Sequence, residues 1–497
     1  MTADVSVAGG EEEARPGEAA FRSDIALLRI IVIAAGLCWS VLFVVIGLRY
    51  ELQLYADGSL FSYSIAVEDA WAFHWHNIPG RLFVYLFSYV PAETYIALTR
   101  DARGGIVAYG FLFFVAQLLG LAATFAADRS RGRIVFCTAC ASTACLCPLV
   151  FGFPTEMWMA HAVFWPALAV CQYVRAGIAG SALAFAVLLA LVLTHEGAVI
   201  LAIAILSTLL LRGVRDKAFL RAAGIFVVVM AIWVLMKAAF PPDAYVGAAM
   251  ARIARQFFDA GILTSGLMLL LAGTLAAYAI AFLVLRRLSP ATAHISAAAI
   301  VAVALAAYWL WFDRSLHTDD RYYMRTVLLI ATPVLGVPAA VQMLAADGRL
   351  ALRVPFLPHL MAVLTNGVTV RACTGAFLVV MLVHAVETAK FVKAWTQYEA
   401  AVRALAMGSA SDPVLGDTRF VSSQRIGDDL NRLSWFSTTH FLSVLVTPGF
   451  APARLVVDPQ ATYFSLSCAT ARANEEALRV VPVASRRLVR VYACLHR

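Results

Sequence analysis

Apolar runs close to 20 residues long recur along most of this 497-residue chain. The hydrocarbon core of a bilayer is about 30 Å thick, and a helix needs roughly 20 apolar residues to cross it. Inside lipid every backbone polar group must be satisfied internally, so helices are the plausible spanning form. The composition agrees, because 62% of the residues are hydrophobic and only 14% are charged, against about a quarter charged in soluble domains. The sequence therefore predicts an all-α polytopic membrane bundle.

We expect about eleven transmembrane helices. They are predicted near residues 25–47, 105–125, 134–152, 157–174, 178–194, 197–211, 222–240, 265–285, 293–312, 325–345 and 372–392. The first run follows the acidic stretch EEEARPGEAA and is long enough to remain as an anchor rather than a cleaved signal peptide. The marginal segment 81–99 contains Pro91 and Glu93, and counting it as a span would place basic loops on both sides. We therefore expect it to lie along the outer surface as an interfacial helix.

The net charge of +8 comes largely from short loops that this topology places on one side. These loops contain Arg129, Arg131, Arg133, Arg175, Arg212, Arg215, Lys217, Arg221, Arg286, Arg287, Arg349 and Arg353. Short cytoplasmic loops carry an excess of lysine and arginine, so this side is predicted to be cytoplasmic. The same rule explains the basic residues without a nucleic-acid partner.

The predicted organisation has three parts. Residues 1–24 form a cytoplasmic tail, and residues 25–392 form the bundle, with an interfacial first outer loop at 48–104. Residues 393–497 form a small extracytoplasmic α/β domain, with strand-like pieces such as RLVVD and RRLVRVYACLHR. Cys468 and Cys494 would then lie in an oxidising compartment, where a disulfide can form. The lack of a eukaryotic sorting signal favours a bacterial inner membrane, with this domain in the periplasm.

The cysteine-rich run CTACASTACLC at 137–147 has a spacing that superficially suggests a metal site. It has no histidine partner, and small residues within membrane helices commonly form packing surfaces. We interpret this run as a helix-packing surface.

Unusual polar residues collect on the predicted outer face. They are Asp57, Glu68, Asp69, His74, His76, Arg81, Glu156, His161, His195, Glu196, Asp313, His317, Asp319, Asp320, Arg321 and Arg325. Ionisable groups near a bilayer are costly, which favours a functional cavity. Ordinary solvation explains part of the set, and Glu156 with His161, five residues apart near one helical face, can form a structural ion pair. His195 and Glu196, between two apolar spans, are the hardest to explain by solvation.

The stretch DGSLFSYSIA at 57–66 lies just beyond the first span on the outer side, and an aromatic-rich segment and a bundle follow it. This plan resembles the GT-C class of membrane glycosyltransferases, in which the first outer loop carries the key acidic residue and forms interfacial helices. Asp57 stands at that position, and Glu68 with Asp69 forms a second acidic pair. The stretch DDRYYMRTVLLIATP at 319–333 looks like the arginine-tyrosine start of a late helix in such enzymes. A soluble outer domain after the bundle is also common in the class.

The resemblance implies transfer of a sugar from a polyprenyl-phosphate donor to a lipid or glycan acceptor, within a membrane and without nucleic acid. Asp57 is the candidate catalytic base, with Glu68 or Asp69 as substitutes. Arg321 and Arg325, four apart, are suited to holding the departing phosphate. The expected substrate-binding residues are His74, His76, Arg81, Glu156, His161, His195, Glu196, Asp320, Arg321, Tyr322 and Arg325. No cofactor is predicted, although a divalent metal between carboxylates and phosphate oxygens would be compatible with the class.

Three other functions compete with this one, and one of them, a non-catalytic scaffold, would not need His195 and Glu196 between two apolar spans. A transporter or flippase would use Glu156, His195 and Glu196 as a proton or substrate path. It predicts paired repeats and ionisable groups on both sides of the midplane, whereas this chain shows no repeat and its polar residues favour one face. A histidine-dependent membrane transferase or glycan polymerase would instead centre its chemistry on His195.

Overall fold

The computed structural model describes residues 16–66, 78–152, 154–175, 177–239, 265–313, 318–350, 366–408, 413–414, 417–435 and 438–458. At 16–22, 78–80, 318–325, 413–414 and 417–420 it describes the backbone alone.

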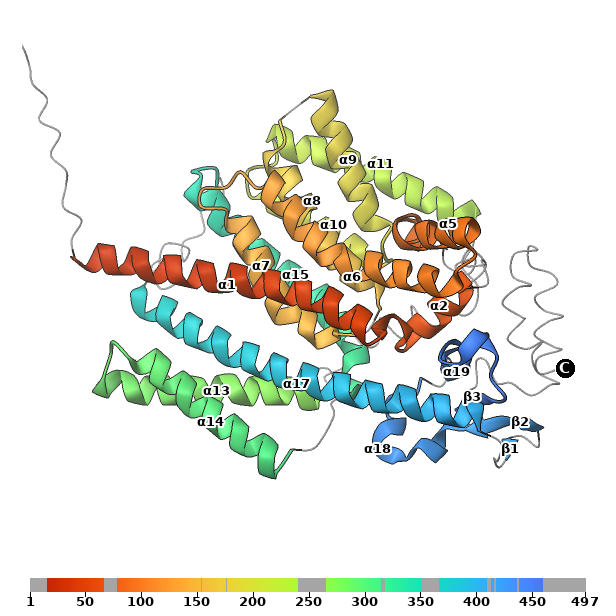
Figure 1. The fold of residues 1–497 in the computed structure, drawn as a ribbon. Coiled ribbons are helices and arrows are strands. Elements are labelled where there is room, and N and C mark those ends of the chain that lie inside the picture. Colours follow the sequence, from red (N-terminus) through yellow and green to blue (C-terminus); the bar gives the residue numbers. More distant parts are fainter. Residues whose placement is uncertain are drawn as a thin grey trace, which may run out of the picture.

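A helix lies at each of the eleven places where the apolar runs predict one, so the helical bundle is confirmed (Figure 1). These helices are α1 (Pro16–Arg49), α6 (Ala102–Ala127), α7 (Ile134–Leu146), α8 (Glu156–Tyr173), α9 (Ile178–Val192), α10 (Ala198–Leu210), α11 (Lys217–Ala239), α13 (Gly266–Leu288), α14 (Ala293–Trp311), α15 (Thr318–Ala346) and α17 (Gly367–Met407).

Among the described residues, eight helices are long and apolar enough to cross a membrane. Seven of them are α1, α6, α11, α13, α14, α15 and α17. The eighth is the segment Arg81–Thr99, which the sequence predicts to be interfacial. The helices α9 and α10, and α7 together with η3 (Cys147–Val150), are shorter apolar helices. The count of about eleven spans therefore stays a prediction.

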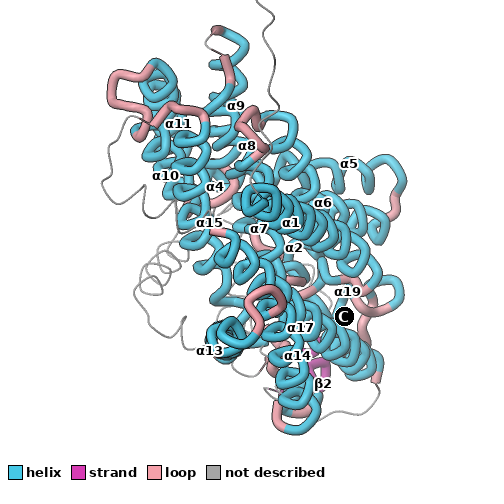
Figure 2. Tube along the Cα trace, turned by 90° about the vertical axis from the view of Figure 1, so that its left-hand side faces the viewer, coloured by secondary structure: helices cyan, strands magenta, loops and turns pink. Residues whose placement is uncertain are grey.

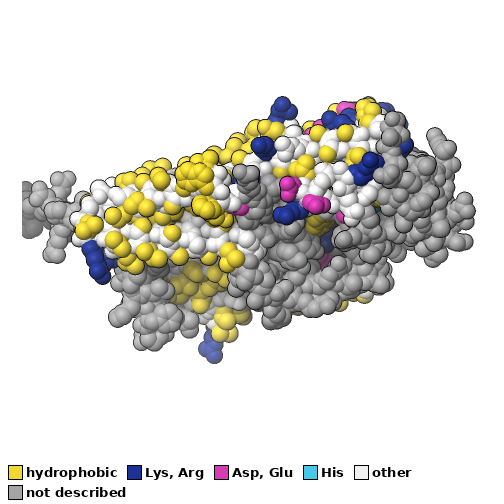
Figure 3. All heavy atoms as spheres, turned by 90° about the horizontal axis from the view of Figure 1, so that it is seen from below, with side chains coloured by type: hydrophobic (Ala, Val, Ile, Leu, Met, Phe, Trp, Pro, Cys, Tyr) yellow, Lys and Arg dark blue, Asp and Glu magenta, His cyan; other side chains and the backbone are white. Residues whose placement is uncertain are grey.

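Hydrophobic side chains cover much of the outer surface of the bundle. Figure 3 shows them over α13 and α14, with charged side chains gathered mainly on the other half of that face. Ile280, Val284, Ile300 and Val303 are among the exposed residues of these two helices. Such a large exposed apolar surface is typical of contact with lipid.

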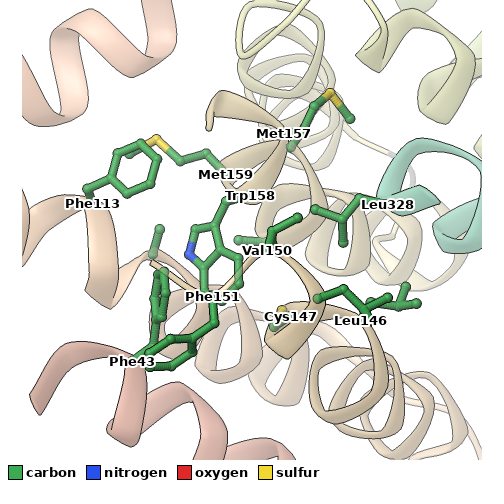
Figure 4. Packing of buried hydrophobic residues seen from close by; sticks show 14 of the residues in the cluster. Phe43, Phe113, Leu146, Cys147, Val150, Phe151, Met157, Trp158, Met159 and Leu328 are labelled. Atoms are coloured by element: carbon green, nitrogen blue, oxygen red, sulfur yellow. The ribbon is translucent and has the colours of Figure 1, made fainter. Parts of the chain in front are cut away.

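Aromatic rings pack among aliphatic and methionine side chains in the core between α1 and α8 (Figure 4). Phe43 of α1 packs against Trp158 of α8, with ring centroids 4.0 Å apart, and against Phe151, at 4.9 Å. Phe114 of α6 closes the group at 4.9 Å from Phe43. Since Trp158 follows Glu156 by two residues, this packing fixes the start of α8.

The cysteine-rich run forms most of α7 and packs closely on α1. A Cβ placed on Gly36 of α1 would lie 2.6 Å from the Cα of Cys140. Only small residues permit such close approach of two helices. The interpretation of this run as a packing surface is confirmed.

The described residues between α1 and α6 contain η1 (Leu52–Leu54), α2 (Asp57–Ala66), α4 (Ile78–Val84), a π-helical turn η2 (Tyr85–Tyr89) and α5 (Val90–Thr99). A Cβ on Gly47, near the end of α1, would lie 2.6 Å from the Phe114 ring, so Phe114 lies beside the end of α1. The turns of α6 that come before Phe114 therefore extend beyond α1. α5 packs against those turns through Ile96 and Gly105. We call this the α2 end of the bundle, and the end where α1 begins the opposite end (Figure 1).

The helix α17 differs from its prediction. Its 41 residues span roughly 60 Å at about 1.5 Å per residue, about twice the thickness of a bilayer core. It continues through Val392 to Met407 without interruption, so the boundary predicted at 393 falls inside a helix.

The described residues after α17 form a small mixed unit at the α2 end. β1 (Pro413–Val414) pairs antiparallel with β2 (Asp417–Ser422), and β2 pairs parallel with β3 (Leu455–Val457). The short helices α18 (Asp428–Asn431) and α19 (Thr439–Leu445) complete the unit, and Figure 2 shows its strand segment beside α17. The strand predicted in RLVVD is confirmed as β3, whereas RRLVRVYACLHR, with Cys494, and also Cys468 lie outside the described residues.

Candidate functional site

Four charged side chains from separate elements meet at the α2 end. Arg81 of α4 contacts Glu156 of α8, with Nη1 and Oε1 2.5 Å apart, and Glu196, with Nε and Oε2 3.7 Å apart. Lys237, in the last turn of α11, lies with its Nζ 3.1 Å from Oε1 of Glu196. We call Arg81, Glu156, Glu196 and Lys237 the charge cluster.

Local structure explains why these side chains converge. Glu156 begins α8, where Thr155 caps the helix by accepting a hydrogen bond from the Met157 backbone N–H. The backbone N–H of Phe83 donates to the carbonyl of Leu193 over 3.0 Å, which ties α4 to the end of α9. Glu196 lies in the short junction between α9 and α10, so it has little freedom to turn away.

The charge cluster is poorly solvated. The side chains of Glu156 and Glu196 are each 4% exposed, and those of Arg81 and Lys237 are 20% and 15% exposed. Burial raises the pKa of Glu196, but the cations beside it, Arg81 first and also Lys237, outweigh burial and lower that pKa to about 2. Glu196 is therefore a carboxylate near neutral pH. Burying two cations with two carboxylates costs desolvation energy, which favours a function for the arrangement.

His195 adds a polar ring beside the charge cluster. Its Nδ1 accepts a hydrogen bond from the backbone N–H of Gly197 over 3.0 Å. In neutral histidine one ring nitrogen carries the hydrogen, so this bond assigns the hydrogen to Nε2. A Cβ on Gly197 would lie 2.8 Å from a methyl group of Leu329 in α15, so the α9–α10 junction packs directly against α15.

Asp57 is the first residue of α2, and its backbone is held from both sides. Ala56, just before it, has a positive φ of 52°, which is uncommon for a residue other than glycine. The Ala56 carbonyl accepts hydrogen bonds of 2.9 Å from the hydroxyls of Ser59 and Thr438. A Cβ on Gly58 would collide with the Gln53 carbonyl and lie 2.5 Å from a ring carbon of Pro154, two residues before Glu156.

Two buried tyrosines pack together at the α2 end. The rings of Tyr89 and Tyr109 lie 5.1 Å apart, and both side chains are fully buried. The Asp57 region and the charge cluster are also close in space, because a Cβ on Gly58 would lie 2.5 Å from Pro154, in the segment that leads into Glu156.

A second group of charges lies between α14 and α17. The Nζ of Lys390 lies 3.4 Å from Oδ2 of Asp313 and 3.1 Å from Oε1 of Glu387. The indole N–H of Trp309 donates to the same Glu387 oxygen over 2.9 Å. Asp313 is thereby placed in a paired setting rather than in a freely solvated loop.

The structure does not bring His161 to the charge cluster. This side chain is 1% exposed, and its ring nitrogens contact Gln117 Oε1 at 3.1 Å and Ser142 Oγ at 2.9 Å. Glu156 and His161 do not form the structural ion pair that their spacing allows, because Glu156 pairs with Arg81 while His161 of α8 contacts side chains of α6 and α7.

Several predicted site residues cannot be placed against these contacts. Glu68, Asp69, His74, His76 and His317 lie outside the described residues. The backbone of Asp319, Asp320, Arg321, Tyr322 and Arg325 is part of α15, but their side chains lie outside the description. Among the described residues, no group of three histidine, cysteine or acidic side chains could hold a metal ion.

Lys237 is the site residue that sequence reasoning missed. A lysine in the last turn of an apolar span is easily interpreted as an anchor at the membrane surface. The available signal was its position, since the predicted topology ends that span on the same face as Glu156 and Glu196. A cation beside buried carboxylates is expected to pair with them.

No protein-family model, curated protein or solved structure matches this chain.

Proposed function

We propose that this protein is a membrane glycosyltransferase of GT-C type, which moves a sugar from a polyprenyl-phosphate donor to a lipid or glycan acceptor. The observation that carries the proposal is the charge cluster at the α2 end together with Asp57, whose neighbour Gly58 packs against Pro154 in the segment leading into Glu156. It offers the two groups that the reaction needs, a carboxylate for the acceptor and cations for a phosphate.

In the proposed reaction, Asp57 is the general base. The acceptor hydroxyl oxygen attacks the anomeric carbon of the sugar while Asp57 takes its proton. The bond from that carbon to the phosphate oxygen breaks, and polyprenyl phosphate leaves with the electron pair. Arg81 and Lys237 stabilise the negative charge that develops on this phosphate. Arg321 and Arg325 remain proposed as further phosphate ligands.

Asp57 is a better candidate base than either glutamate of the charge cluster. Glu156 and Glu196 are buried and already engaged by cations, whereas Asp57 is only partly buried. A base must reach the acceptor and accept its proton. The paired glutamates instead hold Arg81 and Lys237 in place, which makes them positioning residues. Glu68 and Asp69 remain the proposed substitutes.

The proposed orientation follows the basic loops. They would lie in the cytoplasm of a bacterial cell, with about eleven spans in the inner membrane. The α2 end and residues 393–497 would then face the periplasm. Nucleotide sugars are not available on that side, which is why the donor is proposed to be a polyprenyl-linked lipid.

The proposal is tested by mass spectrometry of envelope lipids and glycans. Cells lacking the protein are complemented with wild type, with Asp57→Asn or with Asp24→Asn. Asp24 is a matched control, because it pairs with Arg371 at the opposite end over 3.7 Å. We expect a glycan that is lost in the deletion and restored by wild type and Asp24→Asn, but not by an equally expressed Asp57→Asn. An unchanged profile in the deletion would contradict the proposal.

Two observations favour the competing functions. The Nε2–H of His195 beside Glu196 suits a histidine-dependent transferase or glycan polymerase. The buried contacts of His161 with Gln117 and Ser142 suit a polar path within a transporter. If Asp57→Asn restores the product in cells that lack the protein whereas His195→Gln does not, the histidine-dependent transferase or polymerase is favoured. If the deletion abolishes uptake of a substrate and leaves the glycan profile unchanged, the transporter is favoured.

A further inference from the structure

The opposite end of the bundle contains a basic concavity that the proposed reaction does not use. It consists of two adjoining hollows of about 480 Å³ each, which share Tyr173 and Arg349. The first is also lined by Arg212, Lys217 and Arg221. The second is also lined by Arg129, Arg131 and Arg175. We call the two together the basic hollow.

The carboxylates of the basic hollow are used within the protein. Asp347 accepts a hydrogen bond from the Tyr173 hydroxyl over 2.7 Å and one from the Arg131 backbone N–H over 3.3 Å. Asp216 caps the start of α11 by accepting from the Ala218 backbone N–H over 2.8 Å, and it also pairs with Arg212. Seven basic residues therefore face two carboxylates that local structure already engages.

Specific contacts hold the basic residues around this space. Arg221 donates to the carbonyls of Arg175 and Val174 over 2.9 and 3.0 Å, which fixes the loop between α8 and α9. The Arg349 guanidinium lies over the Tyr173 ring, 5.9 Å from its centroid. Within the described part of the chain, Arg129, Arg175 and Arg349 form no ion pair with a carboxylate.

The positive-inside rule explains why these residues lie on one side of a membrane. It does not explain why four separate loops bring them to a shared concavity, since like charges repel when they are crowded together. A bound anion removes that repulsion, and guanidinium groups bind phosphate oxygens in a bidentate manner. The two halves, joined at Arg349, fit two phosphate groups.

We propose that the basic hollow binds an anion with two phosphate groups, carried by a membrane lipid. The lipid is favoured over a soluble phosphate because exposed apolar side chains lie within three residues of the lining residues along the chain. Ile178, Val214 and Leu220 are 92%, 65% and 55% exposed, and they can contact acyl chains. Basic pockets between helices on the cytoplasmic side of membrane proteins bind such headgroups.

The test measures lipid binding to the purified full chain in detergent. The probes are diphosphatidylglycerol, phosphatidylglycerol and inorganic pyrophosphate. We expect diphosphatidylglycerol to bind more tightly than phosphatidylglycerol. We expect Arg175→Gln with Arg349→Gln to weaken binding of diphosphatidylglycerol by about tenfold or more. The control pair, Arg286→Gln with Arg287→Gln, removes two charges from the last turn of α13 at the same end and should change affinity by less than about twofold.

Three results would overturn the proposal. Equal losses of affinity for diphosphatidylglycerol in the two double variants would mean that the lipid is attracted to the basic surface in general and not to the basic hollow. Equal affinity for the one-phosphate and two-phosphate lipids would remove the requirement for two phosphates. Competition by pyrophosphate as strong as that by the lipid itself would assign the hollow to a soluble phosphate compound. Melting curves without lipid establish that each variant is folded, and Arg349→Gln alone serves if the double variant is not.

Discussion

The two ends of the bundle carry charge in opposite ways. At the α2 end, Arg81 and Lys237 are held by buried carboxylates from other elements. At the opposite end, Arg175 and Arg349 are exposed, and the carboxylates near them support local structure instead. Buried paired charges are fixed before any ligand arrives, which suits positioning for a reaction. Exposed cations around a hollow suit recruitment of an anion from outside.

This difference predicts that changes of charge at the two ends will have different consequences for stability. Removing one member of a buried pair leaves the other charge without compensation in a poorly solvated place. Removing an exposed cation from a crowded basic surface leaves no buried charge without a partner.

The largest effect on stability is expected for Glu196→Gln. The change leaves Arg81 and Lys237 without a carboxylate partner at Glu196, and we expect a loss of about 3–5 kcal/mol. Thermal or denaturant unfolding in detergent measures it. The control is Asp24→Asn, because Asp24 and its partner Arg371 are 23% and 32% exposed and exposed pairs contribute less than about 1 kcal/mol. Equal losses in the two variants would mean that the charge cluster is not a buried network.

The pH dependence of stability provides a second test at the same residue. The folded-state pKa of Glu196 is about 2, below its ordinary value of 4.5. Its contribution to stability is therefore complete above pH 4.5 and is lost as the pH falls toward 2. Melting temperatures of wild type and Glu196→Gln should converge across this window. A constant difference between them would contradict the lowered pKa.

A smaller loss is expected for Gly58→Ala. The added Cβ would meet the Gln53 carbonyl and Pro154, and overpacking of this kind costs about 1–3 kcal/mol. In the same unfolding measurement, Gly224→Ala is the control, because a Cβ at that helical position meets nothing within 4 Å. It should be neutral, or stabilising by up to about 1 kcal/mol. No loss in Gly58→Ala would mean that α2 does not pack tightly against the start of α8.

The smallest effect is expected at the opposite end. Without lipid, Arg175→Gln with Arg349→Gln should change the free energy of unfolding by no more than about 0.5 kcal/mol per site, in the direction of greater stability because repulsion falls. A loss of stability as large as that of Glu196→Gln would contradict the difference predicted between the two ends.

The sequence predicted the helices well because membrane helices depend on apolar length, which is visible in any one sequence. It did not predict that α17 continues past the expected span to Met407, since residues 393–407 are amphipathic and hydropathy alone does not distinguish such a helix from a loop. The C-terminal unit packs on α2 through the hydrogen bond from Thr438 to Ala56, and such contacts between distant segments leave no local signal.

For the site, the sequence identified Arg81, Glu156 and Glu196 but not how they pair. Glu156 was matched with His161 because the two lie on nearly one helical face, whereas the true partner comes from α4, 75 residues earlier in the chain. Pairing depends on how helices pack, and spacing along one helix does not determine that. Lys237 was overlooked because its charge has an ordinary explanation at a span end.

The most direct test of the proposed reaction is a transfer assay with purified protein. Wild type, Asp57→Asn and Asp24→Asn are placed in lipid nanodiscs with envelope lipids from cells that lack the protein, and release of polyprenyl phosphate is measured. Asp57 begins α2, where a helix dipole contributes only about 1 kcal/mol or less, so Asp57→Asn should remain folded. We predict that it releases the product at least about a hundredfold more slowly than wild type, while Asp24→Asn matches wild type. Equal rates for Asp57→Asn and wild type would contradict Asp57 as the base.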